Sequence, residues 1–376
     1  MNLLASNPLS DLDPAPWVTP CPAVRGVTVG LIGPGKVGSA LLEQLLAARS
    51  ALRQDPGVDL RLRVVADSRR MWLDHENEHL GPHVSGTCTW RPSSLDAVGE
   101  SLAGLPCPVL IDCSASDRVA SHYAHWLASG IHVVTPNKLA VSGPLERWQA
   151  IGQARAGGAQ LRYEATVGAG LPVVQTLRDL LATGDTLQSV EGLFSGTLAW
   201  LFDGYDGKVP FSHRIREARE LGYTEPDPRA DLSGEDVARK LVILAREAGM
   251  DLSLEQVDVT SLVPPALHEL DLETFLERMN ELDDDLAERH ALAASRGEVL
   301  RHVGRLEADG RASVRLLALP ADHPLAQGRG CDNIVRFRSR RYPDPGLRVQ
   351  GPGAGPEVTA AGVFADLLRV AAEARA

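Results

Sequence analysis

Residues 27–46 read VTVGLIGPGKVGSALLEQLL, and this stretch decides the fold of the amino-terminal part of the chain. It opens with a short apolar, β-branched run, which is typical of a buried parallel strand. The run ends at Gly33, and apolar residues at helical spacing follow Lys36. The pattern GPGKVG between strand and helix predicts a dinucleotide-binding turn, in which the amino terminus of the helix faces the phosphates. A merely structural glycine turn is the alternative.

Outward from this unit the same alternation continues. Strand patterns that end in a polar turn recur at residues 60–68, 108–116 and 131–138. Helical segments separate the later ones. This order predicts an α/β protein with a Rossmann-type, doubly wound parallel sheet and crossover helices.

The alternation of strand and helix patterns ends at about residue 160, and long helical patterns dominate the rest of the chain. Residues 298–318 alternate around Asp309-Gly310, which is a hairpin signal. Helical patterns cover residues 211–222, 233–249, 273–296 and 357–375. We therefore expect a second, α+β domain for substrate binding and dimerisation. The expected boundaries are a Pro-rich extension at 1–23, a dinucleotide-binding domain at 24–163 rejoined by 353–376, and the second domain at 164–352.

Composition excludes several classes of partner. The net charge is −11, so clustered basic residues for a nucleic acid are not expected. No apolar run reaches the length of a membrane span, roughly 18 residues. The five cysteines lack CxxC spacing, which indicates reduced thiols and a cytoplasmic location, without a disulfide framework.

The glycine turn supplies most of the predicted cofactor site, and four further residues extend it. The first glycine makes the tight turn, the second admits the pyrophosphate, and the third allows close packing of helix on strand. Asp67 and Arg69-Arg70 end the next strand, where an acid suits a ribose hydroxyl and an arginine suits a 2′-phosphate. NADP is slightly favoured over NAD, with use of both left open. The predicted cofactor residues are Gly33, Gly35, Lys36, Val37, Gly38, Arg69, Ser114, Lys138 and Gly353.

His75-Glu76-Asn77-Glu78-His79 matches the zinc-protease pattern HExxH. The pattern lies inside the dinucleotide-binding unit, and Gly81-Pro82 ends any helix immediately afterwards. No third ligand follows at a familiar spacing. We interpret the match as coincidence, and a zinc hydrolase is the corresponding alternative function.

Two more strands end in chemistry-bearing residues, DCSAS at 112–116 and TPNK at 135–138. Ligands bind beyond the carboxyl ends of strands in doubly wound folds. Lys138 is therefore expected to face the nicotinamide and a substrate oxygen, with an ordinary surface lysine as the alternative.

Residues 222–240, GYTEPDPRADLSGEDVARK, crowd five acids ahead of one lysine. Ser233 and Asp236 have the spacing of a capping box, which predicts a helix start. Asp236 and Lys240 are four residues apart and share one helix face, at the edge of the apolar stripe. A metal, a cationic substrate and solvent are the three candidate partners of these acids. The prolines hold the loop extended, which suits capture of an ammonium group.

These motifs together resemble the homoserine dehydrogenase family from about residue 26 to the end. The resemblance is carried by GPGKVG, DSRR, DCSAS, VVTPNK, YEATVGAGLP, FSGTLAWLF, GYTEPDPRADLSGEDVARKLVILARE and GPGAGPEVTAAGVFADLLR. It is greatest for the dehydrogenase portion of bifunctional aspartokinase–homoserine dehydrogenases. No kinase half is recognised ahead of it and no ACT domain after it, so feedback by threonine through such a domain is not expected.

The resemblance implies NAD(P)-linked interconversion of L-aspartate 4-semialdehyde and L-homoserine, in threonine, methionine and isoleucine biosynthesis. Lys240 would be the acid that protonates the alkoxide, with Lys138 as the second lysine of the site. Glu225, Asp231 and Asp236 would bind substrate. The backbone carbonyls of Glu164, Val167, Ala169 and Leu171 would coordinate Na⁺ or K⁺. A homodimer that pairs strands near 298–350 is also implied.

Two rival functions remain beside this one and the zinc hydrolase. The chain could oxidise or reduce a different amino-acid alcohol or aldehyde, which substrate tests would reveal. It could also be a silent NADP-binding sensor, although the presence of both lysines argues against that.

Overall fold

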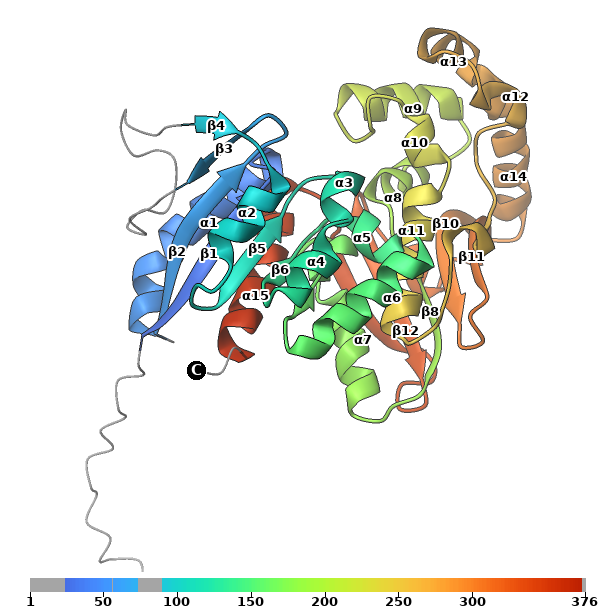
Figure 1. The fold of residues 1–376 in the computed structure, drawn as a ribbon. Helices are drawn as coiled ribbons and strands as arrows, with labels where there is room; N and C mark the ends of the chain where they lie inside the picture. Colours follow the sequence, from blue (N-terminus) through green and yellow to red (C-terminus); the bar gives the residue numbers. More distant parts are fainter. Residues whose placement is uncertain (1–23, 56, 74–89, 374–376) are drawn as a thin grey trace, which may run out of the picture.

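The computed structural model describes residues 24–55, 57–73 and 90–373. Within these residues the strands form a seven-stranded and a six-stranded sheet, with helices packed around both (Figure 1). The expected fold class, a Rossmann-type sheet joined to an α+β unit, is confirmed.

The first sheet has the strand order β4-β3-β2-β1-β5-β6-β7. Its central strands pair in parallel, and their Val, Ile and Leu side chains are buried on both faces, as expected for strands covered by helices on each side. The strands are β1 (Arg25–Ile32), β2 (Val58–Ala66), β3 (Arg70–Leu73), β4 (Trp90–Pro92), β5 (Pro108–Asp112), β6 (His132–Val134) and β7 (Leu161–Arg162).

Strands β3 and β4 depart from the expected all-parallel sheet, because β3 pairs antiparallel with both β2 and β4. Arg69 lies in the turn that follows β2, and Arg70 begins β3. The strands are four and three residues long, too short for a period-2 pattern to stand out.

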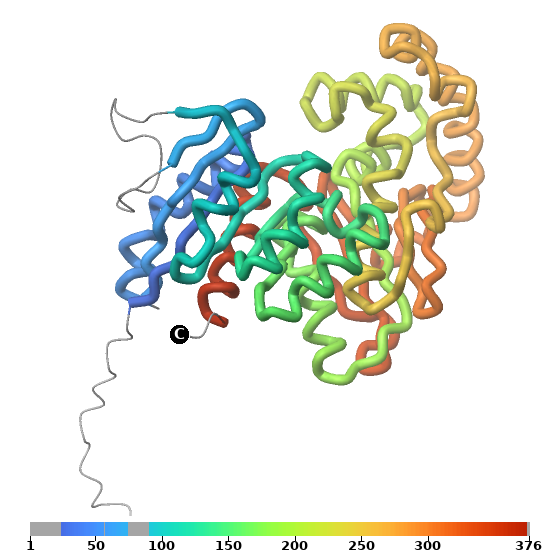
Figure 2. The backbone as a smooth tube through the Cα atoms, viewed as in Figure 1, coloured from blue at the N-terminus to red at the C-terminus, as the bar shows by residue number. Residues whose placement is uncertain are grey.

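Helices cover the two faces of this sheet. On one face α1 (Lys36–Gln54) and α15 (Pro356–Glu373) contribute to one buried apolar cluster. The other face is covered by α2 (Leu95–Leu102), α3 (Asp117–Ala120), α4 (Tyr123–Ala128), α5 (Lys138–Ser142) and α6 (Leu145–Ala154). Helix α15 comes from the far end of the chain, and Arg25 donates hydrogen bonds to the carbonyls of Ala371 and Ala372 at its end. The two ends of the described chain therefore lie close together (Figure 2).

The second sheet has the order β13-β12-β8-β10-β11-β9. The predicted hairpin is present as β10 and β11, which pair antiparallel. The strands are β8 (Leu187–Leu193), β9 (Asp258–Val259), β10 (Glu298–Glu307), β11 (Ala312–Pro320), β12 (Asp332–Ser339) and β13 (Leu347–Pro352).

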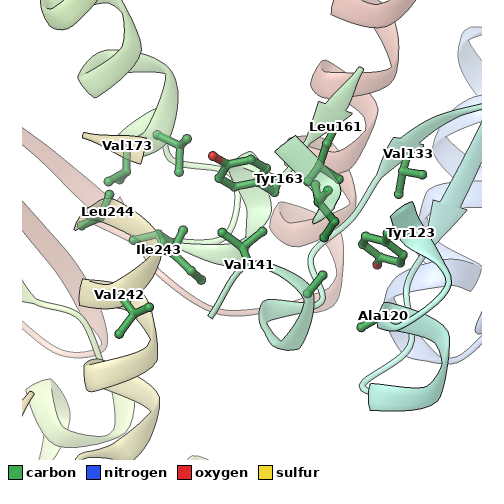
Figure 3. Close-up of a cluster of buried hydrophobic side chains, with 14 of the residues drawn as sticks. Ala120, Tyr123, Val133, Val141, Leu161, Tyr163, Val173, Val242, Ile243 and Leu244 are labelled. Carbon is green, nitrogen blue, oxygen red and sulfur yellow. The ribbon is translucent and has the colours of Figure 1, made fainter. Parts of the chain in front are cut away.

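Helix α11 (Glu235–Glu247) joins the two sheets. It contacts α5, α7 (Val173–Ala182) and β10. Its apolar residues belong to a single buried cluster that also contains side chains of both sheets, part of which is shown in Figure 3. Because this core is continuous, the residues at the start of α11 have fixed positions relative to both sheets.

A helical lobe completes the molecule and has its own apolar cluster. Its helices are α8 (Gly196–Asp203), α9 (Phe211–Glu220), α10 (Arg229–Leu232), α12 (Pro265–His268), α13 (Leu272–Arg278) and α14 (Asp283–Ser295). The single helical pattern expected at 273–296 is divided by a 3₁₀ turn, η4 (Met279–Leu282). The other 3₁₀ turns are η1 (Arg155–Gly157), η2 (Glu164–Thr166), η3 (Leu254–Gln256) and η5 (Pro324–Gln327). Within the described ranges, no helix combines the length and apolar character that a membrane crossing requires.

Candidate active site

A cleft of about 1130 Å³ opens where the two sheets and the helical lobe meet. Its walls come from the carboxyl ends of β5 and β6, the start of α8, the acidic segment 222–240 and the start of α15. The predicted residues Val37, Ser114, Lys138, Ala169, Glu225, Asp231, Asp236, Lys240 and Gly353 all line it. Residues from distant parts of the sequence are thus gathered in one place.

The glycine turn has the geometry that each of its glycines predicts. Gly33 has a φ of +83°, and a Cβ there would lie 2.8 Å from the Ser114 nitrogen. A Cβ on Gly38 would lie 2.3 Å from the Gly33 carbonyl oxygen. At Gly35 nothing lies within 4 Å of the Cβ position, so a ligand can approach the backbone there.

Asp67, at the end of β2, stabilises the turn that follows this strand. Asp67 Oδ1 accepts the backbone N–H groups of Arg69 and Arg70, at 2.7 and 2.8 Å. These bonds hold the pKa of the carboxyl below its usual range. The Arg70 guanidinium pairs with the same carboxylate and lies 4.5 Å from the centre of the Trp90 ring. Arg69 is exposed.

Lys240 lies at the bottom of the cleft and is only 7% exposed. Its Nζ donates to the Phe194 carbonyl oxygen at 2.6 Å and pairs with Asp236 Oδ2 at 2.8 Å. Asp236 Oδ1 pairs in turn with Lys138 Nζ at 3.0 Å. One carboxylate therefore bridges the two predicted lysines.

The neighbouring charges of this bridge shift the pKa values of Asp236 and Lys240. Burial lowers the pKa of the Lys240 ammonium, Asp236 opposes this change, and Lys138 adds to it. Burial disfavours the charged form of Asp236, yet the two lysines outweigh it and hold the pKa of that carboxyl well below its usual range. A lysine whose pKa is lowered gives up its proton more readily than a free lysine, which suits it to act as base as well as acid.

Arginines neutralise two of the five acids in segment 222–240. Asp227 makes a bidentate pair with Arg229, and Glu235 pairs with Arg239 on the helix surface. The other three acids are Glu225, Asp231 and Asp236. Asp231 is half-buried, and its Oδ2 accepts the Glu225 N–H at 2.8 Å. Burial raises the pKa of Asp231, while this hydrogen bond and one from the Thr197 hydroxyl oppose the rise.

One expectation for α11 was wrong. The helix does start at the predicted place, but its amino-terminal cap is Gly234 with a φ of +78°, and Ser233 and Asp236 form no capping box. Asp236 is instead turned to the two lysines. Arg246, near the end of the same helix, is buried and donates to the carbonyls of Val141 and Gly143.

Sequence reasoning missed three contributors. The Phe194 carbonyl accepts from both Lys240 and the buried Asn333 amide, whose Nδ2 lies 3.3 Å away. A Cβ on Gly353 would lie 2.0 Å from Asn333 Cγ, which explains the glycine there. Thr197 Oγ1 lies 2.6 Å from the Tyr223 carbonyl and 3.0 Å from Asp231 Oδ1. The motif FSGTLAWLF contains Phe194 and Thr197, but it has no ionisable side chain that would have indicated a site.

The loop at 164–171 contains buried charge. The Glu164 carboxylate accepts the N–H groups of Val174 and Gln175 at the start of α7. Burial, together with the nearby negative charge of Asp366, raises the pKa of this carboxyl to about 7. Ala169 is one of two non-glycine residues with positive φ in the described chain, at +54°. Of the four carbonyls predicted to hold a cation, those of Glu164 and Leu171 also accept backbone hydrogen bonds within the loop.

The HExxH pattern at 75–79 lies outside the described residues. Among the residues that are described, no group of three or more His, Cys, Asp or Glu side chains could hold a metal ion.

A Rossmann-type sheet whose glycine turn opens onto a cleft with acids and two lysines defines the chain as a two-domain protein of the nicotinamide-linked dehydrogenase class. Family comparison makes this specific. The model described as "Homoserine dehydrogenase, NAD binding domain" matches residues 33–164, and the model described as "Homoserine dehydrogenase" matches residues 172–368. The chain belongs to the homoserine dehydrogenase family, as its motifs predicted.

Three relatives illustrate the extent of the match. A homoserine dehydrogenase of Saccharomyces cerevisiae is 37% identical over 362 residues, which cover 93% of this chain and 99% of that protein. The chloroplastic bifunctional aspartokinase/homoserine dehydrogenase 1 of Zea mays is 46% identical, and the match covers 92% of this chain but only 38% of the maize protein. A crystal structure of a Candida auris protein of unknown function superposes with a TM-score of 0.86 at 36% identity, covering 93% of this chain and 99% of that one.

Proposed function

We propose that the chain interconverts L-homoserine and L-aspartate 4-semialdehyde with a nicotinamide dinucleotide. The observation that carries the proposal is the bridge Lys138–Asp236–Lys240 in a cleft that is also lined by Val37 of the glycine turn and by the acidic segment. Family membership supports the same reaction. The chain spans less than half the length of the bifunctional relatives, so the activity is proposed for this chain alone.

The acids that no arginine neutralises suit the amino end of such a substrate. Glu225 and Asp231 lie at the cleft wall, and a primary ammonium group can donate to two carboxylates at once. The substrate carboxylate would face the start of α8, where Gly196 and Thr197 line the cleft. Backbone N–H groups in the first turn of a helix have no partner within the helix and favour an anion.

Lys240 can supply the proton chemistry in both directions. When bound, the cofactor supplies or accepts the hydride. Two of the three ammonium hydrogens of Lys240 are directed to Asp236 and Phe194, which leaves the third for a substrate oxygen. In aldehyde reduction that hydrogen is given to the developing alkoxide. In alcohol oxidation the neutral amine presents its lone pair in the same direction and accepts the hydroxyl proton.

We propose NADP as the preferred cofactor, because Asp67 is committed to its own turn. Its Oδ1 already accepts two backbone N–H groups, and its Oδ2 faces Arg70. An acid held this way is less able to accept from a ribose 2′-hydroxyl. The exposed Arg69 is well suited to a 2′-phosphate. The residues of the glycine turn, Ser114, Lys138 and Gly353 complete the proposed cofactor site.

A monovalent cation is proposed for the loop at 164–171, held by the carbonyls of Glu164, Val167, Ala169 and Leu171. Each carbonyl has two lone pairs, so the two that accept a hydrogen bond can still coordinate a cation. The buried carboxyls of Glu164 and Asp366 add negative potential beside the loop. Replacing K⁺ or Na⁺ by choline should then lower the melting temperature, and an unchanged value would argue against the site.

Assembly and division of labour are also proposed. Residues 24–163 with 353–376 would bind the cofactor, whereas 164–352 would bind substrate and form a homodimer through strands β10–β13. The cytoplasmic location remains a prediction from the cysteines, of which Cys107, Cys113 and Cys331 are free thiols.

The proposed function is tested by initial rates of NADP⁺ and NAD⁺ reduction with L-homoserine at mildly alkaline pH. Other amino-acid alcohols and an N-acylated homoserine serve as comparison substrates. Turnover with homoserine, and its loss when the ammonium group is blocked, is expected. Turnover only with another alcohol would show that this alcohol, and not homoserine, is the substrate. Cofactor binding without any turnover would favour the silent sensor.

A further inference from the structure

A fully buried carboxylate stands behind the cleft, where β5 ends. Asp112 is 0% exposed. Its Oδ1 accepts the Ser114 N–H at 2.8 Å, and its Oδ2 accepts the Tyr123 hydroxyl at 2.6 Å and the Asn137 side-chain amide at 3.0 Å. All three donors are neutral groups. A buried charge held only by neutral donors is costly to maintain, so a purely packing role is a poor explanation for it.

The hydrogen bonds around Asp112 join two loops that the cleft requires. Thr135 Oγ1 donates to the Asp112 carbonyl at 2.8 Å and accepts the Asn137 N–H at 2.8 Å. The Tyr123 hydroxyl also lies 2.9 Å from Thr135 Oγ1. The loop after β5 and the loop after β6 are thus connected through one cluster, with Tyr123 of α4 at its centre.

Both loops continue into the cleft. Ser114, two residues after Asp112, lines the cleft. On the other loop, Asn137 Nδ2 donates to Asp112 while its Oδ1 accepts the Leu139 N–H and caps α5. Lys138 is the first residue of that helix and reaches Asp236. The position of Asn137 therefore determines where the backbone of Lys138 lies at the start of α5.

We propose that Asp112, held by Tyr123, is a positioning residue that fixes Ser114 against the cofactor and Lys138 against Asp236. This rests on the proposed function for Lys138, but the cofactor half of the proposal does not depend on which alcohol is oxidised. Asp112 touches neither reactant and acts through the two residues that line the cleft.

The test removes the hydroxyl group of one buried tyrosine and, as a control, that of a second buried tyrosine. Tyr123→Phe removes a donor from Asp112 and leaves the ring in place. Tyr163→Phe is the control, because Tyr163 is equally buried in the same apolar cluster and its hydroxyl also donates to a carboxylate, that of Glu247 at the far end of α11 (Figure 3). For each variant the dissociation constant of NADPH is measured by fluorescence titration, and kcat and KM are measured with homoserine.

Tyr123→Phe should weaken NADPH binding several-fold and lower kcat by roughly tenfold, since small displacements of positioning groups carry large rate penalties. Tyr163→Phe should change neither by more than about twofold, even if it unfolds at a lower temperature. Asp112→Asn should exceed Tyr123→Phe, because an amide cannot accept from all three donors. Wild-type kinetics in Tyr123→Phe, or equal losses in both tyrosine variants, would overturn the proposal. If wild-type protein does not oxidise homoserine, the proposed function fails and the NADPH titrations alone decide the positioning role.

Discussion

Lys240 combines burial with two fixed hydrogen-bond partners, and this combination determines its chemistry. The spacing of Asp236 and Lys240 predicted their pairing on one helix face, and the pair is present at 2.8 Å. The Phe194 carbonyl was not predictable, because a backbone acceptor leaves no trace in residue type. The same holds for the capping box, where Asp236 is drawn to two lysines instead of the backbone N–H groups.

The first prediction concerns the pH dependence of homoserine oxidation. Lys240 must be neutral to accept a proton, so kcat/KM should rise with pH and level off above the pKa of Lys240, which lies below its ordinary value of 10.5. Asp236→Asn removes the charge that raises this pKa, so the rise should move to lower pH. The maximal rate should also fall by roughly tenfold as Lys240 loses an anchor. A pH–rate profile that moves to higher pH would contradict the assignment.

Arg69 carries the second prediction. Arg69→Ala should raise the KM for NADP⁺ by roughly tenfold, the effect of losing one charge-assisted hydrogen bond. The KM for NAD⁺ should stay the same. Arg70→Ala is the control with the same loss of charge, and it should have the smaller effect because Arg70 is already engaged by Asp67 and Trp90. Equal effects on both cofactors would show that Arg69 does not read the 2′-phosphate.

The strand–turn–helix unit at 25–54 was predictable almost completely, because its signals are local. A buried apolar run, glycines at fixed offsets and a helical period all lie within thirty or so residues. Strands β3 and β4 were not, because each is too short to show a period and β4 is well separated in sequence from its partner β3. The Asp112 cluster could not be predicted either, because it joins three separate segments: the loop after β5, helix α4 and the loop after β6.

The glycine turn gives a prediction that separates folding from binding. Gly38→Ala should reduce the free energy of unfolding by about 1–3 kcal/mol, because the added methyl overlaps the Gly33 carbonyl. Gly35→Ala should leave stability unchanged, since its Cβ would meet no atom within 4 Å, but it should weaken NADP⁺ binding. Denaturant unfolding and cofactor titration on both variants measure this. Stability lost at Gly35, or binding unaffected there, would count against the turn as the pyrophosphate site.

For the whole molecule, the sequence predicted two units and their order, and the structure adds how they are joined. Helix α11 lies in a core shared by both sheets, so the cleft is built on a rigid element and not on a flexible linker. This sharing could not be read from periodicity, which reports that a face is buried without reporting what buries it.

The outer face of the second sheet leads to a prediction about assembly. Leu317 and Leu319 of β11 are only partly buried there, beside the small apolar cluster of Leu193, Val303, Leu325 and Ile334. We expect light scattering after size-exclusion chromatography to give twice the chain mass, and the melting temperature to rise with protein concentration. Leu317→Lys should shift the protein towards monomer. A monomeric wild type at all concentrations would rule out the proposed dimer.

The central claim, that Lys240 exchanges the proton with substrate, is tested most directly by Lys240→Met. Homoserine-dependent NADP⁺ reduction and NADPH binding are measured on the same preparation. We predict that turnover falls by at least about 100-fold, the lower range for loss of a general acid or base, while the NADPH dissociation constant stays within about twofold. Near-normal turnover, or loss of cofactor binding together with activity, would contradict the assignment of Lys240 as the proton donor and acceptor.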